Sequence, residues 1–342
     1  MPCRDYRAAH LLRNGQLQTF LASSRLRARG PNPMRAAARE TVIDTCECIR
    51  LLGARSTPPV APRGMVVLLH GWEGSMDSTY VQRTGGALFA RGFEVFRLNY
   101  RDHGRSHHLN TGIFYAVKDA EVCDAVRRIA AAAADRPAYL VGFSLGGNFA
   151  LRIALRCGDR SIPNLRHVVG ISPVLDPAAS TDLADRHPLI RSYFLGKWRR
   201  SLATKQTLYP ERYDFGAVLR LRTIRETTAR LVAEHSDYPR LDDYFRDYTL
   251  TGDHLRTLPV PTTLVTAVDD PVIPAADFAR LRLNRSTRVV LRPHGGHLGF
   301  LHGSGLQSRY ERDLPEFFIG LEEGVGRPGY PGYKMQDSGC RR

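Results

Sequence analysis

A serine stands between two glycines in residues 142–146 (GFSLG), where the sequence changes from strand-like to helix-like. Residues 137–143 (PAYLVGF) are apolar and carry aromatic side chains, which predicts a short buried strand. Residues 148–156 (NFALRIALR) carry apolar side chains at helical spacing. This pattern is typical of a nucleophile elbow, a strained strand-to-helix turn that exposes a serine hydroxyl above the edge of a sheet. Ser144 is therefore the candidate nucleophile, and a chance match in a glycine-containing loop is the alternative.

Two adjacent carboxylates, Asp269 and Asp270, follow a predicted strand at residues 262–268 (TTLVTAV). A serine hydroxyl is a weak nucleophile and needs a base that an acid orients. Downstream of an elbow, the acid precedes the histidine in the chain. We favour Asp270 because Pro-Val-Ile-Pro follows it, as is usual for this acid. Asp269 remains the alternative, and Asp176, after a predicted strand at 168–172, is a weaker third candidate.

Two histidines, His294 and His297, follow another predicted strand at residues 287–291. A glycine pair precedes His297 and an apolar run follows it, so its loop can fold over Ser144. His294 follows a proline and is expected to brace the loop instead. An ordinary core or surface role is the alternative for either histidine. The order Ser144, Asp270, His297 predicts a catalytic triad whose members each lie just after a strand.

A fourth motif, residues 70–75 (HGWEGS), follows an apolar run at 65–69 (MVVLL) that predicts a buried strand. The loop after such a strand supplies one backbone N–H of an oxyanion hole, and the residue after the nucleophile supplies the other. We assign these donors to Trp72 and Leu145. Taken alone, the His-Gly pair would be an ordinary turn at a strand end.

Strand and helix patterns alternate along the middle of the chain, which predicts a mostly parallel sheet with helices on both faces. Together with the nucleophile elbow, this is the arrangement of an α/β-hydrolase fold. The expected elements are strands at 65–69 and 94–99, helices at 79–91 and 116–133, and then the elbow.

The expected organisation has three parts. Residues 1–45 form a basic, loop-like N-terminal arm, residues 46–322 form the hydrolase domain, and residues 323–342 form a disordered tail rich in glycine and proline. The domain begins with a strand at 46–52. Residues 177–250 break the alternation with helical, aromatic-rich segments, and in this fold such an insertion forms a lid over the serine. Simple packing of these aromatic side chains onto the core is the alternative.

These motifs together resemble the YheT-like branch of the α/β-hydrolase superfamily, which includes bacterial predicted esterases and the animal abhydrolase domain proteins 1 and 3. The resemblance covers roughly residues 10–322. The residues that carry it are 14–19 (NGQLQT), 70–75 (HGWEGS), 142–148 (GFSLGGN), 223–226 (TIRE), 269–271 (DDP) and 294–300 (HGGHLGF). It implies carboxylic ester hydrolysis, with some members acting on phospholipid acyl chains. Asp102 and His103 depart from the family, which usually has Arg-Gly and a small residue there.

The composition fits a globular enzyme, with 342 residues, 43% hydrophobic and 24% charged. No run approaches the roughly 18 apolar residues of a membrane-spanning helix, and the N-terminus lacks the apolar core of a signal peptide. The animal proteins that the chain resembles carry an N-terminal membrane anchor, and we expect none here. We predict a cytoplasmic protein.

Six cysteines are present without the spacing of a disulfide framework, so we expect reduced thiols. Cys46 and Cys48 fall in a predicted strand with both side chains on one face, a poor arrangement for a disulfide or a metal clamp. His103, His107 and His108 lack a ligand spacing and are expected to be solvated or at the pocket rim. We therefore expect neither a metal nor a cofactor, and no phosphate-binding glycine motif is present.

The formal net charge is +15, which raises the question of an acidic partner. Only four of the 49 basic residues are lysine, and the arginines are spread along the chain. The preference for arginine over lysine is better explained by GC-rich codons than by a surface that binds an acidic partner. We therefore expect no specific nucleic-acid partner and only weak peripheral contact with anionic membranes.

We expect a small-molecule ester substrate, cleaved through an acyl-enzyme intermediate. Three alternatives use the same fold: a cofactor-free perhydrolase, a lipid acyl hydrolase at membrane surfaces, and a non-catalytic binding protein. The intact candidate triad argues against the last of these.

Overall fold

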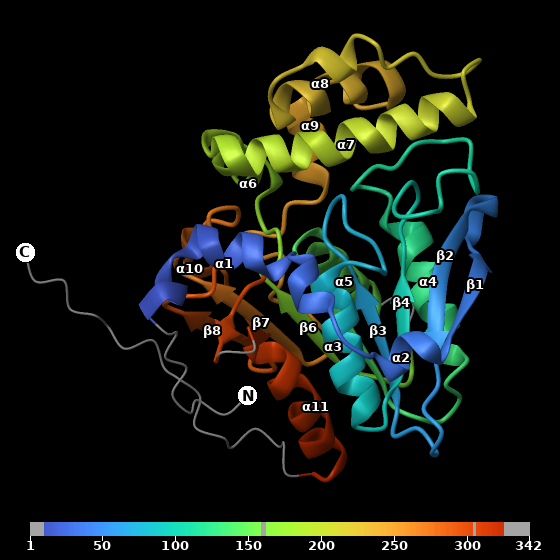
Figure 1. Cartoon of the computed structure of the whole chain (residues 1–342), viewed down its shortest axis with the longest axis vertical. Helices are drawn as coiled ribbons and strands as arrows, with labels where there is room; N and C mark the ends of the chain where they lie inside the picture. Colours follow the sequence, from blue (N-terminus) through green and yellow to red (C-terminus); the bar gives the residue numbers. More distant parts are fainter. Residues whose placement is uncertain (1–9, 159–161, 304–305, 325–342) are drawn as a thin grey trace, which may run out of the picture.

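The computed structural model describes residues 10–158, 162–303 and 306–324 (Figure 1). Its centre is an eight-stranded sheet in the order β1-β2-β4-β3-β5-β6-β7-β8. The strands β3 to β8 run parallel, and only β2 pairs antiparallel with its neighbours β1 and β4. The predicted mostly parallel sheet is thereby confirmed. Its parallel strands are β3 (Met65–Leu69), β4 (Glu94–Leu98), β5 (Ala138–Phe143), β6 (Leu165–Ile171), β7 (Thr262–Ala267) and β8 (Thr287–Arg292).

Helices cover both faces of this sheet, which explains why its central strands are apolar at every position. Successive side chains of β3 point to opposite faces. Val67 and Leu69 join a core cluster with α4 (Asp119–Ala131) and α5 (Leu145–Arg156). Val66 and Leu68 join a second cluster with α3 (Thr79–Ala90) and α11 (Arg309–Glu322). The two clusters hold the sheet between them, so its carboxyl edge is a rigid platform.

The first strand differs from its prediction. β1 (Ala38–Asp44) and β2 (Arg50–Ser56) form an antiparallel hairpin, and the intervening Cys46–Cys48 is a 3₁₀ turn where a strand was expected. Glu47 and Cys48 both have a φ of 57°, so the two cysteines do not share a strand face. β1 is an edge strand with mostly exposed, charged side chains, and this pattern is what made it look like a loop.

The N-terminal arm is also more ordered than its predicted loop-like character. It holds the helices α1 (Gly15–Ala22) and α2 (Pro33–Ala36) and the 3₁₀ turns His10–Arg13 and Arg25–Ala28. Asn14 caps α1 by accepting a hydrogen bond from the Leu17 N–H at 2.9 Å. The buried Met34 packs into the cluster beneath α3. Most of the predicted tail, residues 325–342, lies outside the described residues.

A helical insertion separates β6 from β7 and lies above the carboxyl edge of the sheet (Figure 1). It contains α6 (Pro177–Arg186), α7 (Pro188–Leu208), a 3₁₀ turn (Val218–Arg220), α8 (Ile224–His235) and α9 (Leu241–Asp247). The chain then returns to the core through β7, the short helix α10 (Ala275–Ala279) and β8, and the small strands β9 (Leu301–His302) and β10 (Gln307–Ser308) precede α11. No helix of the described residues combines the length and apolarity needed to cross a bilayer.

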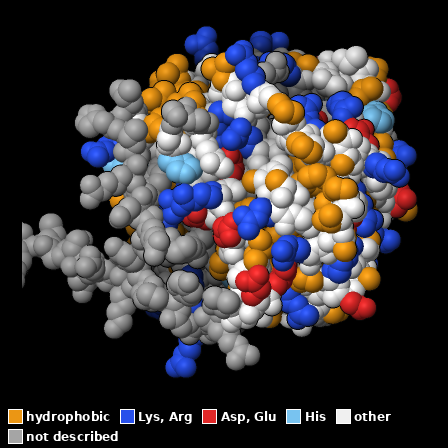
Figure 2. Space-filling view, turned by 60° about the horizontal axis from the view of Figure 1, so that its bottom comes forward, with side chains coloured by type: hydrophobic (Ala, Val, Ile, Leu, Met, Phe, Trp, Pro, Cys, Tyr) orange, Lys and Arg blue, Asp and Glu red, His pale blue; other side chains and the backbone are white. Residues whose placement is uncertain are grey.

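Basic side chains are dispersed over the face shown in Figure 2, where they alternate with acidic and apolar groups. Several arginines are paired with carboxylates, as in the buried pair of Arg27 with Glu311 at 2.5 Å and the pair of Arg55 with Glu94 at 2.6 Å. On that face the excess charge forms no continuous basic stripe.

One buried ion pair fastens the insertion to the core. The Lys205 ammonium on α7 donates to Asp102 Oδ1 at 2.8 Å and to the carbonyls of Asn110 and His107 at 2.6 and 3.3 Å. Asp102 Oδ2 accepts a hydrogen bond from the Phe114 N–H at 2.9 Å. The lysine side chain is 1% exposed and the aspartate side chain 8%, so both charges depend on each other for solvation.

Replacing this lysine, as Lys205→Met, should therefore lower the free energy of unfolding by about 3–5 kcal/mol, because Asp102 loses its buried counter-charge. Lys197→Met is the matched control on the same helix. The Lys197 ammonium lies 5.1 Å from the centroid of the Tyr193 ring, and such a cation–π contact contributes about 1 kcal/mol or less. Urea denaturation of both variants measures the difference. Equal losses would show that the pair does not fasten the insertion.

Candidate active site

Ser144 lies in a tight turn between β5 and α5. Its backbone has φ 55° and ψ −118°, a left-handed conformation that non-glycine residues rarely adopt. The turn is held on both sides: the Ser144 N–H donates to the Ile171 carbonyl at 2.9 Å, and the Ser144 carbonyl accepts from the N–H groups of Gly147 and Asn148 at 2.9 and 3.1 Å. Ordered backbone thus maintains the strained serine at the carboxyl edge of the sheet.

The glycines that flank Ser144 are required by close backbone contacts. A Cβ added at Gly142 would lie 2.0 Å from the Gly146 carbonyl oxygen. A Cβ at Gly146 would lie 2.4 Å from the carbonyl oxygens of both Leu69 and His70, at the end of β3. The G-x-S-x-G spacing is therefore a packing requirement of three backbone segments that meet beneath the serine.

The hydroxyl of Ser144 belongs to a hydrogen-bonded chain with His297 and Asp270. Ser144 Oγ lies 2.9 Å from His297 Nε2, and His297 Nδ1 lies 3.0 Å from Asp270 Oδ2. With the Nδ1 proton directed to the carboxylate, Nε2 is the acceptor for the serine hydroxyl. Asp270 Oδ1 accepts the N–H groups of Val272 and Ile273 at 2.8 and 3.0 Å, which fixes the carboxylate. All three residues are buried.

The alternative candidates lie elsewhere. Asp269 Oδ1 accepts the N–H groups of Gly295 and Gly296, both at 2.8 Å, so this carboxylate supports the loop that carries the histidine. His294 lies against the same carboxylate, with Nδ1 3.5 Å from Asp269 Oδ2. Asp176 caps the N-terminus of α6 by accepting from the Ala179 N–H at 3.0 Å. None of these three side chains is hydrogen-bonded to Ser144 or His297 in the described structure.

The N-terminal helix α1 holds the histidine loop, a role that sequence reasoning missed. The Thr19 hydroxyl accepts a hydrogen bond from the His297 N–H at 2.8 Å, and the buried Gln18 side chain accepts from the Leu301 N–H at 2.7 Å. A Cβ at Gly15 would lie 2.0 Å from the Asp269 carbonyl oxygen, and one at Gly296 would lie 2.2 Å from the Gly15 carbonyl oxygen. The NGQLQT stretch could have pointed to this role, because a capping residue and a glycine are followed by three polar side chains at the start of one short helix.

The loop after β3 packs against the elbow and is fixed by buried side chains. The Gly71 N–H donates to the Tyr80 hydroxyl at 2.9 Å, and the Tyr100 hydroxyl donates to the His70 carbonyl at 2.9 Å. His70 Nδ1 bonds the Gly71 carbonyl at 2.7 Å, and burial lowers the pKa of His70 well below its usual range, so the ring is neutral. A Cβ at Gly71 would lie 3.1 Å from the Ser144 Cβ. The loop therefore touches the serine.

Trp72 and Leu145, the expected oxyanion donors, lie next to Gly71 and Ser144 respectively. No acceptor among the described residues takes a hydrogen bond from either backbone N–H. Both residues also line the cavity that Ser144 lines.

Two of the three histidines after β4, His103 and His107, are more buried than expected, whereas His108 is exposed. His103 Nε2 accepts from the Glu73 N–H at 3.2 Å, while its Nδ1 donates to the Arg101 carbonyl at 2.8 Å. Burial lowers the pKa of His103 to about 4, so it is neutral at physiological pH. His107 is also buried and bonds the Ser201 hydroxyl at 2.9 Å. Within residues 10–158, 162–303 and 306–324, no three His, Cys, Asp or Glu side chains form a metal-binding group.

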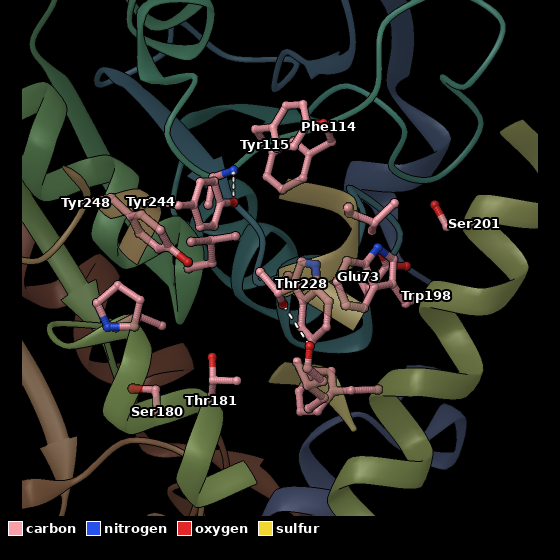
Figure 3. Close-up of a pocket in the computed structure, with 18 of the residues that line it drawn as sticks. Glu73, Phe114, Tyr115, Ser180, Thr181, Trp198, Ser201, Thr228, Tyr244 and Tyr248 are labelled. Atoms are coloured by element: carbon pink, nitrogen blue, oxygen red, sulfur yellow. Dashed lines mark hydrogen bonds between the residues drawn. The ribbon is translucent and has the colours of Figure 1, made fainter. Parts of the chain in front are cut away.

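A cavity of about 140 Å³ lies between the elbow and the insertion (Figure 3). Its walls are mostly apolar and come from the loops of the core and from α6, α7, α8 and α9. The Trp72 ring stacks on Phe194 with centroids 5.4 Å apart and meets Trp198 edge-on at 4.8 Å, and these three rings form the wall where the β3 loop meets α7. Substrate atoms in this cavity would reach Ser144 with little surrounding water.

Comparison with known proteins gives a consistent result. A family model described as "Alpha/beta hydrolase family" matches residues 66–306. The chain is 25% identical over 262 residues to "Putative esterase YheT" of Escherichia coli (strain K12), a match that covers 74% of this chain and 75% of that protein. It is 24% identical over 246 residues to "Phospholipase ABHD3" of Mus musculus, covering 70% of this chain and 59% of that protein. The match thus spans less than two thirds of the mouse relative, and the resemblance to the YheT-like branch is confirmed.

Solved structures share the fold. Alpha/beta hydrolase domain-containing protein 10 from mouse aligns with a TM-score of 0.51 at 16% identity, covering 84% of this chain and all (100%) of the mouse chain. Serine hydrolase CCSP0084 from the bacterium Cycloclasticus zankles aligns with a TM-score of 0.54 at 16% identity, covering 84% and 99%. At these identities the likeness concerns the fold alone.

The close backbone contacts beneath Ser144 predict that a side chain at Gly142 destabilises the folded protein. Gly142→Ala should lower the free energy of unfolding by several kcal/mol, on the order of 3 or more, because its Cβ must displace backbone. Gly320→Ala in α11 is the matched control: its Cβ meets no atom within 4 Å, and alanine in a helix should be neutral or stabilising by up to about 1 kcal/mol. Urea denaturation compares the two. A Gly142→Ala protein as stable as the control would contradict the packing account.

Proposed function

We propose that this chain, which belongs to the alpha/beta hydrolase family, is a serine esterase that cleaves carboxylic esters through an acyl-enzyme intermediate. The observation that carries the proposal is the buried hydrogen-bonded chain from Ser144 Oγ through His297 to Asp270, whose serine lines a mostly apolar cavity. Relatives named as an esterase and a phospholipase support ester hydrolysis as the reaction class.

In the proposed mechanism, His297 Nε2 takes the proton of Ser144 as Oγ attacks the ester carbonyl. His297 then donates this proton to the departing alkoxide, which leaves as the alcohol. A water molecule, deprotonated by His297, attacks the acyl-serine, and collapse of the second tetrahedral intermediate releases the acid and restores Ser144. Asp270 keeps the Nδ1 proton in place and stabilises the imidazolium that forms in each half-reaction.

Negative charge develops on the carbonyl oxygen in both half-reactions. We assign its stabilisation to the backbone N–H groups of Trp72 and Leu145. The assignment is supported by their positions beside Gly71 and Ser144, and by the absence of an acceptor for either group in the described structure. Because Tyr80 and Tyr100 fix the β3 loop, the Trp72 donor would need little rearrangement during the reaction.

A phospholipid acyl hydrolase is a second candidate within the same chemistry. Its support is the mouse relative named phospholipase, together with Leu189 and Tyr193, which are 67% and 39% exposed on the first turns of α7. Release of fatty acid from phospholipid vesicles, compared with turnover of a soluble ester, distinguishes the two candidates. Turnover restricted to vesicles would favour the lipid substrate.

Ser144→Ala should reduce kcat for ester hydrolysis by about 10³-fold or more, because no other group can form the acyl intermediate. Ser172→Ala is the matched control. Ser172 also has a positive φ at the end of a strand, and its buried hydroxyl has no partner among the described residues, so its removal should leave kcat nearly unchanged. Steady-state assays on a soluble ester check both variants. Near-normal turnover by a folded Ser144→Ala protein would remove this serine from the mechanism.

The adjacent carboxylates should respond differently to neutralisation. Asp270→Asn places an amide opposite His297 Nδ1 and favours the wrong tautomer, so kcat should fall by about 10³-fold or more. Asp269→Asn keeps an amide oxygen that can accept the N–H groups of Gly295 and Gly296, so its effect should be less than about tenfold. Comparison of kcat at a fixed pH tests this assignment, and a reversed order would transfer the acid role to Asp269.

A further inference from the structure

Most polar side chains that line the cavity form hydrogen bonds with other groups of the protein. Hydroxyls on several walls bond to backbone carbonyls, so that most of the cavity wall is apolar. These bonds run from Tyr115 to the His235 carbonyl at 2.5 Å, from Thr228 to the Ile224 carbonyl at 2.8 Å, and from Ser201 to the Asp102 carbonyl at 3.1 Å. Lys205 is likewise satisfied by Asp102 and two carbonyls.

Two lining side chains differ: the Ser180 hydroxyl, which has no partner among the described residues, and Glu73. Its carboxyl lines the cavity beside Trp198 (Figure 3), and it is the only titratable lining side chain for which the described structure holds neither a hydrogen bond nor an ion pair. Burial raises the pKa of Glu73 to about 8, although Lys197 and Arg200 on α7 partly oppose the shift. At neutral pH the group is therefore a carboxylic acid, which offers an O–H donor and a carbonyl acceptor.

The backbone at Glu73 adopts a strained conformation. Glu73 has a φ of 53°, in the left-handed region that costs a non-glycine residue roughly 1–2 kcal/mol. Its N–H is held by His103 Nε2 at 3.2 Å, and His103 is in turn oriented by the Arg101 carbonyl. A glycine would remove the strain and the desolvated acid together. Glu73 is half-buried in the free protein. Strained backbone and an unpartnered acid of raised pKa in a cleft are features that gather at functional sites.

We propose that the Glu73 carboxyl is the substrate-recognition group of this cavity, and that the preferred ester carries one neutral hydroxyl on an otherwise apolar body. This inference rests on the proposed ester hydrolysis. It adds the substrate class, which neither the elbow nor the hydrogen-bonded chain at Ser144 specifies.

The surroundings favour a hydroxyl over a charged group. A hydroxyl both accepts and donates, so it can satisfy both halves of a neutral carboxyl. A cationic substrate group would be opposed by Lys197 and Arg200, and an anionic one by desolvation among the apolar walls and by the nearby Asp102. An ester with only apolar groups would leave the Glu73 carboxyl buried without a partner, which costs binding free energy.

The experiment compares esters that differ only in the position of one added hydroxyl. Methyl hexanoate is compared with analogues that carry a hydroxyl at each successive position of the acyl chain, and hexyl acetate with analogues hydroxylated along the alcohol chain. We expect kcat/KM of the wild-type protein to be at least about tenfold higher for the hydroxylated ester at one position or more. Absence of any such preference, in a protein that hydrolyses the parent esters, would overturn this inference and leave the proposed function intact.

Three variants test whether Glu73 causes the preference for hydroxylated esters. Glu73→Leu should abolish the hydroxyl preference, whereas Glu73→Gln should retain most of it, because the amide keeps a donor and an acceptor. Ser180→Ala is the matched control in the same cavity, since the Ser180 hydroxyl is also buried without a partner among the described residues, and its removal should preserve the preference. Unfolding temperatures confirm that each variant is folded.

Three outcomes would contradict the assignment: a preference that survives in Glu73→Leu, one that is lost in Glu73→Gln, or one that is lost in Ser180→Ala. A folded wild-type protein that hydrolyses none of the esters, hydroxylated or not, would refute the proposed esterase activity and this inference together. The two failures are thus distinguishable in a single set of assays.

Discussion

Close contact of three backbone segments beneath Ser144 is the constraint on which the site depends. The end of β3, the end of β5 and the start of α5 meet at Gly142 and Gly146, where any side chain would overlap a carbonyl oxygen. Sheet pairing prevents these segments from moving apart. The turn at Ser144 must therefore be left-handed, and the hydroxyl is held at the carboxyl edge of the sheet. The same contact brings the β3 loop, with Trp72, against the serine.

Elements far away in the sequence hold the loops that complete the site. Thr19 on the N-terminal helix binds the backbone of His297, and Lys205 on the insertion binds the loop after β4. Because these contacts are buried and charge-assisted or backbone-directed, the loops need no regular structure of their own to keep their geometry. The N-terminal segment is thus part of the site's framework, although it contributes no residue to the hydrogen-bonded chain at Ser144.

The sequence could place Ser144, Asp270 and His297 at strand ends because apolar runs and flanking glycines mark the buried parallel strands. The carboxyl ends of parallel strands share one edge, so these side chains could be expected to meet, and the structure brings them within hydrogen-bonding distance. β1 was missed because a charged edge strand has the composition of a loop. The roles of Thr19 and Glu73 depend on tertiary contacts and cavity walls, which leave no periodic pattern in the chain.

Direct labelling of the nucleophile tests the central claim most sharply. The folded protein is incubated with a fluorophosphonate, which reacts with activated serines, and the adduct is located by peptide mass spectrometry. The account predicts a single adduct on Ser144, formed more slowly while a substrate ester is present in excess and absent from unfolded protein. A folded protein that forms no adduct, or forms it on another serine, would contradict the proposal that the elbow and its hydrogen-bonded histidine constitute a serine hydrolase site.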